Sequence, residues 1–167
     1  MKKLIILLAA AISLLTACTV KYSLSGASIP PDAKTFSVAY FPNNAPMVAP
    51  VLSATLTDEL TQRFASRTSL VQVEEGGDFA FEGEIVGYSS TTSSVSSGDF
   101  ALQNRLTISI KVKFTNAIDD KMSFNRNFSA YADYDSTKLL TEVEGDLIPQ
   151  IVEQLVTDIF QASASNW

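Results

Sequence analysis

The residue with the most distinctive chemistry in this sequence is its single cysteine, at the end of Leu15-Thr16-Ala17-Cys18. The chain starts with two lysines at positions 2 and 3, and an apolar run interrupted by one serine follows over residues 4–15. That run is too short to span a bilayer comfortably. A positive start, a short apolar core and a small residue before the cleavage point are typical of a secretory signal peptide. The pattern therefore predicts a signal peptide over residues 1–17.

The order Leu-Thr-Ala-Cys also resembles a bacterial lipobox, in which the thiol is alkylated with diacylglycerol and the cysteine becomes the new, N-acylated terminus. The alternative is an ordinary signal peptide in which Cys18 is incidental. We predict lipidation, because the one cysteine of the chain falls at the one position that a lipobox requires. Stable anchoring takes two or more acyl chains, which a lipidated Cys18 would carry. The lack of aspartate after it resembles the context of outer-membrane lipoproteins, so we expect a lipid anchor on the periplasmic side of that membrane.

The chain contains no histidine, which excludes Ser-His-Asp and Cys-His catalysis and removes the commonest zinc ligand. Asp133 and Asp135 have the first spacing of a calcium loop, but the glycine of its sharp turn is missing. Ser136 and Thr137 faintly resemble an O-glycosylation acceptor. We predict no enzyme, no metal site and no cofactor other than the lipid on Cys18.

Charge restricts the partners of the mature chain. Without the two lysines of the signal peptide, ten of the 12 basic residues remain against 18 acidic ones, a net charge of −8. Such acidity argues against nucleic acid and against a broad polybasic contact with anionic headgroups. With Cys18 lipidated, no cysteine remains for a disulfide, so the fold must depend on its core.

Hydrophobic periodicity divides the mature chain into a tether and one domain. Residues 18–34 contain a glycine and two prolines and predict a flexible tether, and residues 35–167 predict a single domain. Thr35–Phe41 alternates like a strand. Met47–Ser66 repeats an apolar residue at every fourth position and predicts an amphipathic helix with Pro50 in its first turn.

From residue 70 onward, apolar residues recur at every second position, as in a strand. Residues 70–73 and 79–88 predict strands, with Phe79, Phe81, Gly83, Ile85 and Gly87 on one face, opposite Tyr88. The turn at 74–78 could close a hairpin or interrupt one long strand, and the Ser/Thr run at 89–97 suits a solvated strand end and hairpin tip. Leu102–Thr115 alternates cleanly and pairs, through a turn at 116–121, with 122–134. A second helix is predicted over 146–163, with Asp146 as its N-cap and Pro149 in its first turn.

These elements predict an α+β two-layer sandwich, with both helices on one face of a roughly four-stranded mixed or antiparallel sheet. We expect the first strand and the strand after the first helix to be parallel neighbours. The other face would be open and would carry Arg105, Lys111 and Lys113, joined by Arg126. It is either an ordinary solvated face or a partly basic surface that docks a larger protein or binds the phosphates of an anionic amphiphile.

Several segments carry a resemblance to a known family: the lipobox, Tyr22–Pro31, Phe36-Ser-Val, Tyr40–Asn44 and Asn104–Asn116. Together they are similar to the lipopolysaccharide-assembly lipoprotein family, LptE, in its short form from Bacteroidota-type bacteria. The resemblance covers essentially the whole mature chain. It implies two helices on a four-stranded sheet, and a plug and assembly partner inside the β-barrel of the translocon LptD. It also implies that some members bind lipopolysaccharide directly through basic residues.

Two other functions remain open from the residues. One is a free-standing periplasmic lipoprotein that binds an amphiphilic ligand in a concave apolar pocket. The other is an accessory factor of a different envelope secretion machine.

Overall fold

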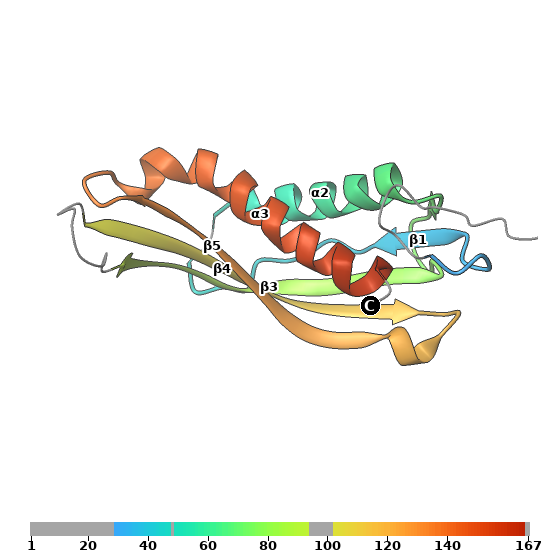
Figure 1. Cartoon of the computed structure of the whole chain (residues 1–167). Helices are drawn as coiled ribbons and strands as arrows, with labels where there is room; N and C mark the ends of the chain where they lie inside the picture. The colour runs from blue at the N-terminus through green and yellow to red at the C-terminus, as the bar shows by residue number, and fades with distance from the viewer. Residues whose placement is uncertain (1–28, 48, 94–101, 166–167) are drawn as a thin grey trace, which may run out of the picture.

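The computed structural model describes residues 29–47, 49–93 and 102–165 (Figure 1). The predicted signal peptide, the lipidation site Cys18 and most of the tether lie outside these residues, as does the end of the Ser/Thr run.

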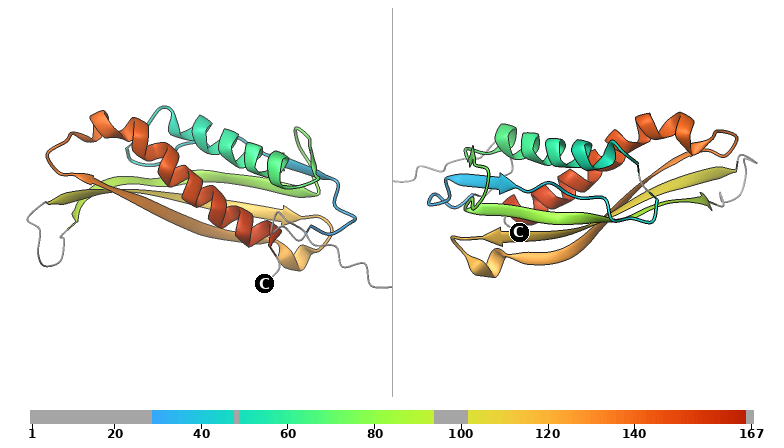
Figure 2. Two further views of the ribbon diagram at one scale, coloured as in Figure 1. Left: turned by 45° about the horizontal axis from the view of Figure 1, so that its top comes forward. Right: turned by 180° about the vertical axis from the view of Figure 1, so that it is seen from behind.

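The described chain forms two layers, a mixed sheet and a pair of helices. In chain order the elements are β1 (Thr35–Val38), α2 (Leu52–Arg67), β2 (Val71–Gln72), β3 (Phe79–Ser93), β4 (Gln103–Asn116), the short 3-10 helix η2 (Asp120–Met122), β5 (Phe124–Asp135) and α3 (Leu140–Ala164). The five strands lie in the order β2-β1-β3-β4-β5. Both helices cover the same face, as two further views show (Figure 2). The predicted α+β sandwich is confirmed, with the two-residue β2 as the additional strand.

The packed layer between helices and sheet is rich in phenylalanine. Phe64 of α2 has no exposed surface and lies at its centre. Its ring centroid is 4.6 Å from that of Phe81, 5.1 Å from Phe160 and 5.8 Å from Phe36. One side chain therefore joins both helices to two strands.

The connection between β2 and β3 is neither a hairpin nor an interruption of one strand. β1 lies between them and is parallel to both, which confirms the expected parallel neighbours. The chain must therefore pass from one side of β1 to the other. Gly77 donates its N–H to Ser37 Oγ at 3.2 Å, and Ser37 is buried although it faces away from the helices. The connection thus crosses the open face of β1, where a Cβ on Gly77 would lie 2.5 Å from the carbonyl carbon of Phe36.

Asp78 fastens the end of this connection to the start of β1. Its Oδ2 accepts the backbone N–H of Lys34 at 2.8 Å, the N–H of Thr35 at 2.9 Å and the hydroxyl of Thr35 at 2.9 Å. These hydrogen bonds lower the pKa of Asp78 below its ordinary value of 3.8, and the bond from the Lys34 N–H has the largest effect. Because the pKa of this carboxyl group is lower in the folded protein than in the unfolded chain, its ionised form stabilises the fold at any pH above the pKa of the unfolded chain. This stabilisation is lost as the pH falls through the pKa of the folded protein.

We therefore expect Asp78→Asn to lower the urea midpoint at pH 7, because the neutral amide accepts these hydrogen bonds less strongly than a carboxylate does. The difference from wild type should narrow as the pH falls below about 4, where the carboxyl group of the unfolded chain becomes protonated, and should vanish only below the lowered pKa of the native carboxyl group. Urea unfolding from pH 7 to pH 3 measures both curves. A difference that stayed constant over this range would show that the charge of Asp78 is not what matters.

A β-bulge at Val86 reverses the faces of the second half of β3. Ile85 pairs with Ile110 and Gly87 pairs with Ser109, so Val86 has no partner on β4. Beyond the bulge Tyr88 faces the helices and Gly87 lies on the open face. The prediction that Gly87 shares a face with Ile85, opposite Tyr88, is therefore wrong, because an inserted residue shifts the two-residue period by one.

Both helices begin elsewhere than predicted. α2 begins at Leu52, five residues after Met47, because a proline at position 50 disfavours helical backbone before it. α3 begins at Leu140, where the Glu142 side chain accepts the N–H of Leu139 at 3.0 Å. Asp146 is therefore not the N-cap, and Pro149 lies inside the helix. Buried apolar residues on both sides of this proline hold the helix on the sheet: Leu147, Ile148, Ile151 and Val152.

Candidate functional site

The face of the sheet away from the helices is the candidate functional surface. On β4 the residues from Leu106 to Phe114 alternate between fully buried side chains under the helices and polar side chains on the other face. The β4–β5 hairpin is confirmed and pairs from Gln103–Asp135 to Phe114–Phe124. Because paired residues share a face, the open face is lined largely by hydroxyl and amide side chains: Ser89, Thr91, Thr107, Ser109, Asn125, Asn127 and Ser129.

Arg105 lies on this face, as predicted, but a carboxylate already holds it. Its Nε donates to Asp133 Oδ1 at 2.7 Å and its second nitrogen donates to Oδ2 at 2.9 Å. Its guanidinium carbon is 3.6 Å from the ring centroid of Tyr131. The hydrogen bonds from Arg105 lower the pKa of Asp133. Two bonds and a stacked ring fix the guanidinium group, so it is poorly placed to receive a phosphate.

The two lysines on β4 also face carboxylates. Lys113 Nζ is 3.0 Å from Glu82 Oε2, and both side chains are more than half exposed. Lys111 is opposite Glu84, whose Oε2 accepts the side-chain amide of Asn44 at 2.7 Å. Lys111 itself makes no hydrogen bond or ion pair to any residue that the structure describes. An exposed pair such as Lys113–Glu82 contributes about 0–1 kcal/mol, so it can exchange partners at little cost.

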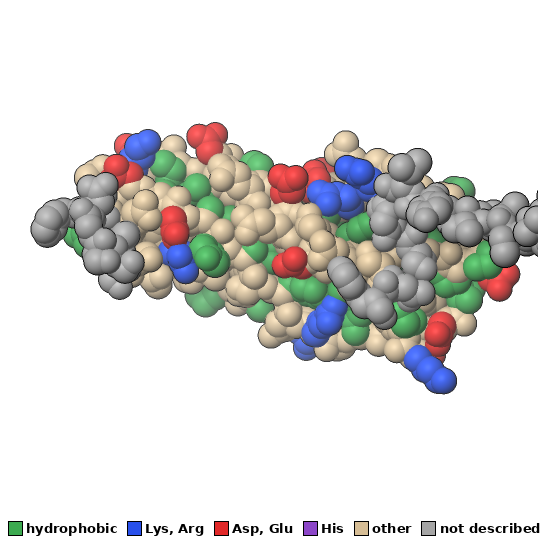
Figure 3. Space-filling view, viewed as in Figure 1, with side chains coloured by type: hydrophobic (Ala, Val, Ile, Leu, Met, Phe, Trp, Pro, Cys, Tyr) green, Lys and Arg blue, Asp and Glu red, His purple; other side chains and the backbone are tan. Residues whose placement is uncertain are grey.

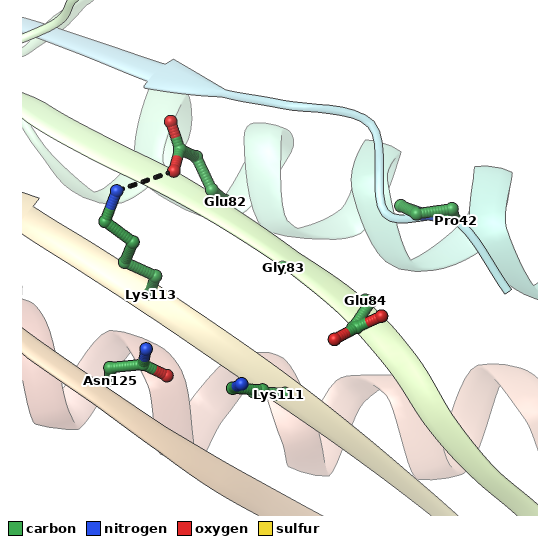
Figure 4. A pocket seen from close by; sticks show the side chains of 7 residues that line it. All are labelled: Pro42, Glu82, Gly83, Glu84, Lys111, Lys113 and Asn125. Carbon is green, nitrogen blue, oxygen red and sulfur yellow. Dashed lines mark hydrogen bonds and ion pairs between the residues drawn. The ribbon is translucent and has the colours of Figure 1, made fainter. Parts of the chain in front are cut away.

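These groups line an open hollow of about 310 Å³ between the segment after β1 and strands β3, β4 and β5 (Figure 4). The backbone of Gly83 forms its floor, and a Cβ at this position would lie on the helix side of β3, where it would collide with the carbonyl oxygen of Lys111 and the ring of the buried Phe41. Two lysines and two glutamates surround that floor, with an amide and a proline beside them: Pro42, Glu82, Glu84, Lys111, Lys113 and Asn125. Alternating charges of this kind match a polar protein segment better than a polyanion.

Arg126 is not on this face, contrary to the prediction. It pairs with Val112 and therefore lies on the helix side of the edge strand β5. Its guanidinium carbon is 4.5 Å from the ring centroid of Phe124 and 4.9 Å from that of Phe128. The sequence did carry this signal, because a residue two positions from both phenylalanines must share their face.

The open face is consequently balanced in charge and not partly basic. Its strands carry three cations and four carboxylates: Arg105, Lys111, Lys113, Glu82, Glu84, Asp133 and Asp135. Figure 3, drawn in the orientation of Figure 1, shows the molecule from the side, and on the surface visible there basic and acidic side chains are scattered among uncharged ones. Such a surface favours docking over binding of phosphate groups.

The other sequence candidates do not converge into a site. Asp133 holds Arg105, whereas Asp135 accepts the N–H of Thr137 at 2.8 Å and its hydroxyl at 2.7 Å; these bonds lower the pKa of Asp135. Across the described ranges, no group of three or more carboxylate, cysteine or histidine side chains could hold a metal ion.

Comparison with protein families gives a match across most of the chain. The model of a family described as lipopolysaccharide assembly, LptE, matches residues 33–163. The chain belongs to the LptE family. This confirms the resemblance drawn from the sequence, and the match spans every helix and strand up to the last turn of α3.

Solved structures share the LptE-type fold at low sequence identity. A hypothetical protein from Chlamydia trachomatis is 10% identical, with a TM-score of 0.53 over 80% of this chain and 99% of that one. A protein of the DUF330 family from Xanthomonas campestris is 14% identical, with a TM-score of 0.52 over 80% and 87%. These likenesses show the fold alone. The comparison with curated proteins finds no match.

No helix among the described residues combines the length and apolar character needed to span a membrane.

Proposed function

We propose that this LptE-family chain is an outer-membrane lipoprotein that plugs the β-barrel of the lipopolysaccharide translocon, LptD, and helps it assemble. Family membership over residues 33–163 carries the proposal. The signal peptide over residues 1–17 would direct export, and diacylglycerol and an N-acyl chain on Cys18 would hold the protein at the membrane. The domain itself performs no catalysis in this proposal.

The open face supports a docking role within such a barrel. Barrel interiors are lined by polar side chains, and this face offers hydroxyls, amides and balanced charges rather than an apolar surface. Direct binding of lipopolysaccharide phosphates by Arg105 is disfavoured, because two hydrogen bonds hold its guanidinium group on Asp133, and Lys113 would first have to leave Glu82. Lys111 and Arg126, without a carboxylate contact within the described chain, are the better candidates for any direct contact.

A free-standing ligand-binding lipoprotein fits the structure less well. Such a protein needs a concave, mostly apolar pocket with a few polar groups. The hollow of Figure 4 is instead surrounded by four charged side chains, and a larger hollow of about 570 Å³ beside β1 has three glutamates in its lining: Glu74, Glu75 and Glu82.

The test is a detergent pull-down of the lipidated protein from outer membranes, with a high-salt wash and identification of whatever stays bound. We expect a large β-barrel recovered near one-to-one. The double variant Lys111→Glu, Lys113→Glu should reduce this recovery several-fold, because it turns a charge-balanced face strongly acidic. Lys121→Glu, on the exposed turn η2, is the matched control and should leave the recovery unchanged. Recovery of the wild-type protein alone and monodisperse would contradict the proposal.

A further inference from the structure

The second half of β3 has a free edge. Near its middle, Ile85 donates its N–H to the carbonyl of Pro42 at 2.9 Å and accepts the N–H of Asn44 at 2.9 Å. The segment after β1 then leaves the sheet. From Gly87 to Ser93, β3 keeps β4 on one side, and no described strand lies on the other (Figures 1 and 2).

This edge is less protected than the others in the sheet. Proteins usually guard free edges with charged residues, prolines, bulges or very short strands. β2 is two residues long, and β5 carries Arg126, Asp133 and Asp135 along its edge. Residues 87–93 read Gly-Tyr-Ser-Ser-Thr-Thr-Ser, without a charge or a proline. A bulge guards the start of this stretch, and Ser89, Thr91 and Thr92 beyond it are exposed.

The edge is also held rigid from behind. The hydroxyl of Tyr88 donates to Glu144 Oε2 of α3 at 2.9 Å, and Ser90 Oγ is hydrogen-bonded to the hydroxyl of Tyr134 on β5 at 2.7 Å. Both tyrosines are buried. These bonds cross from the edge strand to α3 and to the far strand of the sheet. A strand that is fixed before binding loses less conformational entropy when a partner pairs with it.

We infer that residues 87–93 of β3 accept an extended segment of the barrel partner as a sixth strand of the sheet. The inference rests on the proposed function and names the surface through which the partner is bound. Unpaired backbone N–H and C=O groups supply the affinity in this mode of recognition. The hydroxyl side chains along the edge favour an uncharged partner strand rich in serine, threonine or β-branched residues, since such cross-strand pairs are stabilising.

The size of the edge favours this occupant over a second copy of the chain. Seven residues extend about 23 Å along a strand, and pairing of two such edges buries far less than the roughly 1,000 Å² that a stable dimer needs. A partner already held by other contacts meets the edge at high effective concentration, so a short strand suffices. The barrel partner, docked on the open face, satisfies this condition.

Photo-crosslinking in outer membranes tests the inference with the full lipidated protein. A benzophenone amino acid is placed at Ser89 or Thr92, whose side chains lie on opposite faces of the edge, and at Gln154 on the exposed side of α3 as a comparison. We expect both β3 positions to crosslink to the barrel. Adding Ser89→Lys should lower the yield from position 92 by about ten-fold, because pairing would desolvate the new charge. Gln154→Lys, on the exposed side of α3, should leave that yield unchanged.

Ser89 is the better site for the charge, because a lysine at Thr91 would also face Arg105. The melting temperature of purified Ser89→Lys shows whether this variant folds. If the variant does not fold, the crosslinks from positions 89 and 92 in the chain without the lysine still test whether the barrel pairs with this edge. Barrel recovered in the pull-down without crosslinks from either β3 position overturns the inference and leaves the proposed function standing. Crosslinks between two copies of this chain also overturn it. Loss of the barrel from both experiments rejects the proposed function and this inference together.

Discussion

Replacing Phe64 with alanine is expected to lower the free energy of unfolding by about 3–5 kcal/mol. The side chain is fully buried and its ring lies within 6 Å, centroid to centroid, of Phe36, Phe81 and Phe160. Removing it deletes one large buried group and leaves a cavity that two helices and two strands cannot easily close. Domains are typically stable by about 5–15 kcal/mol in total, so this single change would bring the fold close to its limit.

Urea unfolding of the purified protein measures the loss. Phe128→Ala is the matched control, because Phe128 is half-buried on the edge strand β5 and its loss should cost markedly less. A change below about 1 kcal/mol for Phe64→Ala would contradict the packing described here, since large core truncations rarely cost so little.

Gly77→Ala is expected to destabilise the protein by about 2–3 kcal/mol, near the upper end of the usual cost of overpacking. The new Cβ would lie 2.5 Å from the carbonyl carbon of Phe36 and 2.6 Å from the nitrogen of Ser37. Both are backbone atoms of β1, so no side chain can rotate out of the way. The connection would have to lift from the open face, which would also strain the hydrogen bonds of Asp78.

Gly145→Ala is the matched control for this change. Nothing lies within 4 Å of a Cβ at Gly145, and alanine in a helix is favoured over glycine by about 1 kcal/mol. Thermal and urea unfolding should therefore show opposite signs for the two variants. If Gly77→Ala left the free energy of unfolding unchanged, the connection between β2 and β3 would not pass so closely over β1.

Local periodicity predicts much of this fold. The alternation of β4, the hairpin with β5 and the apolar faces of α2 and α3 are properties of neighbouring residues, so the sequence alone reveals them. The two-layer arrangement follows because each helix and the sheet has one apolar face to bury.

Features that depend on distant contacts were not predictable in the same way. The bulge at Val86 adds a residue without any change in composition. A strict two-residue alternation therefore assigns the residues after the bulge to the wrong face of the sheet. The place of β1 between β2 and β3 is a matter of pairing, not of propensity. α3 runs through Pro149 because burial of its apolar face on the sheet outweighs the loss of one helical hydrogen bond.

The same distinction between local patterns and distant contacts applies to the candidate site. Alternation places Arg105, Lys111 and Lys113 on the open face and, applied to β5, would have placed Arg126 on the other. Their ionic partners come from distant residues: Asp133 is 28 positions from Arg105, and Glu82 is 31 positions from Lys113. Strand register brings each pair together, so the balanced charge of the face becomes visible with the structure.

The most direct test of the proposed role in lipopolysaccharide export is the amount of newly made lipopolysaccharide that reaches the cell surface when this protein is depleted. Surface labelling after a pulse of radioactive sugar measures it. We expect a several-fold fall, restored by the wild-type chain but not by Cys18→Ser, which would lack the anchor. Unchanged surface lipopolysaccharide after complete depletion would contradict the account, because a barrel without its plug and assembly partner should not deliver its substrate.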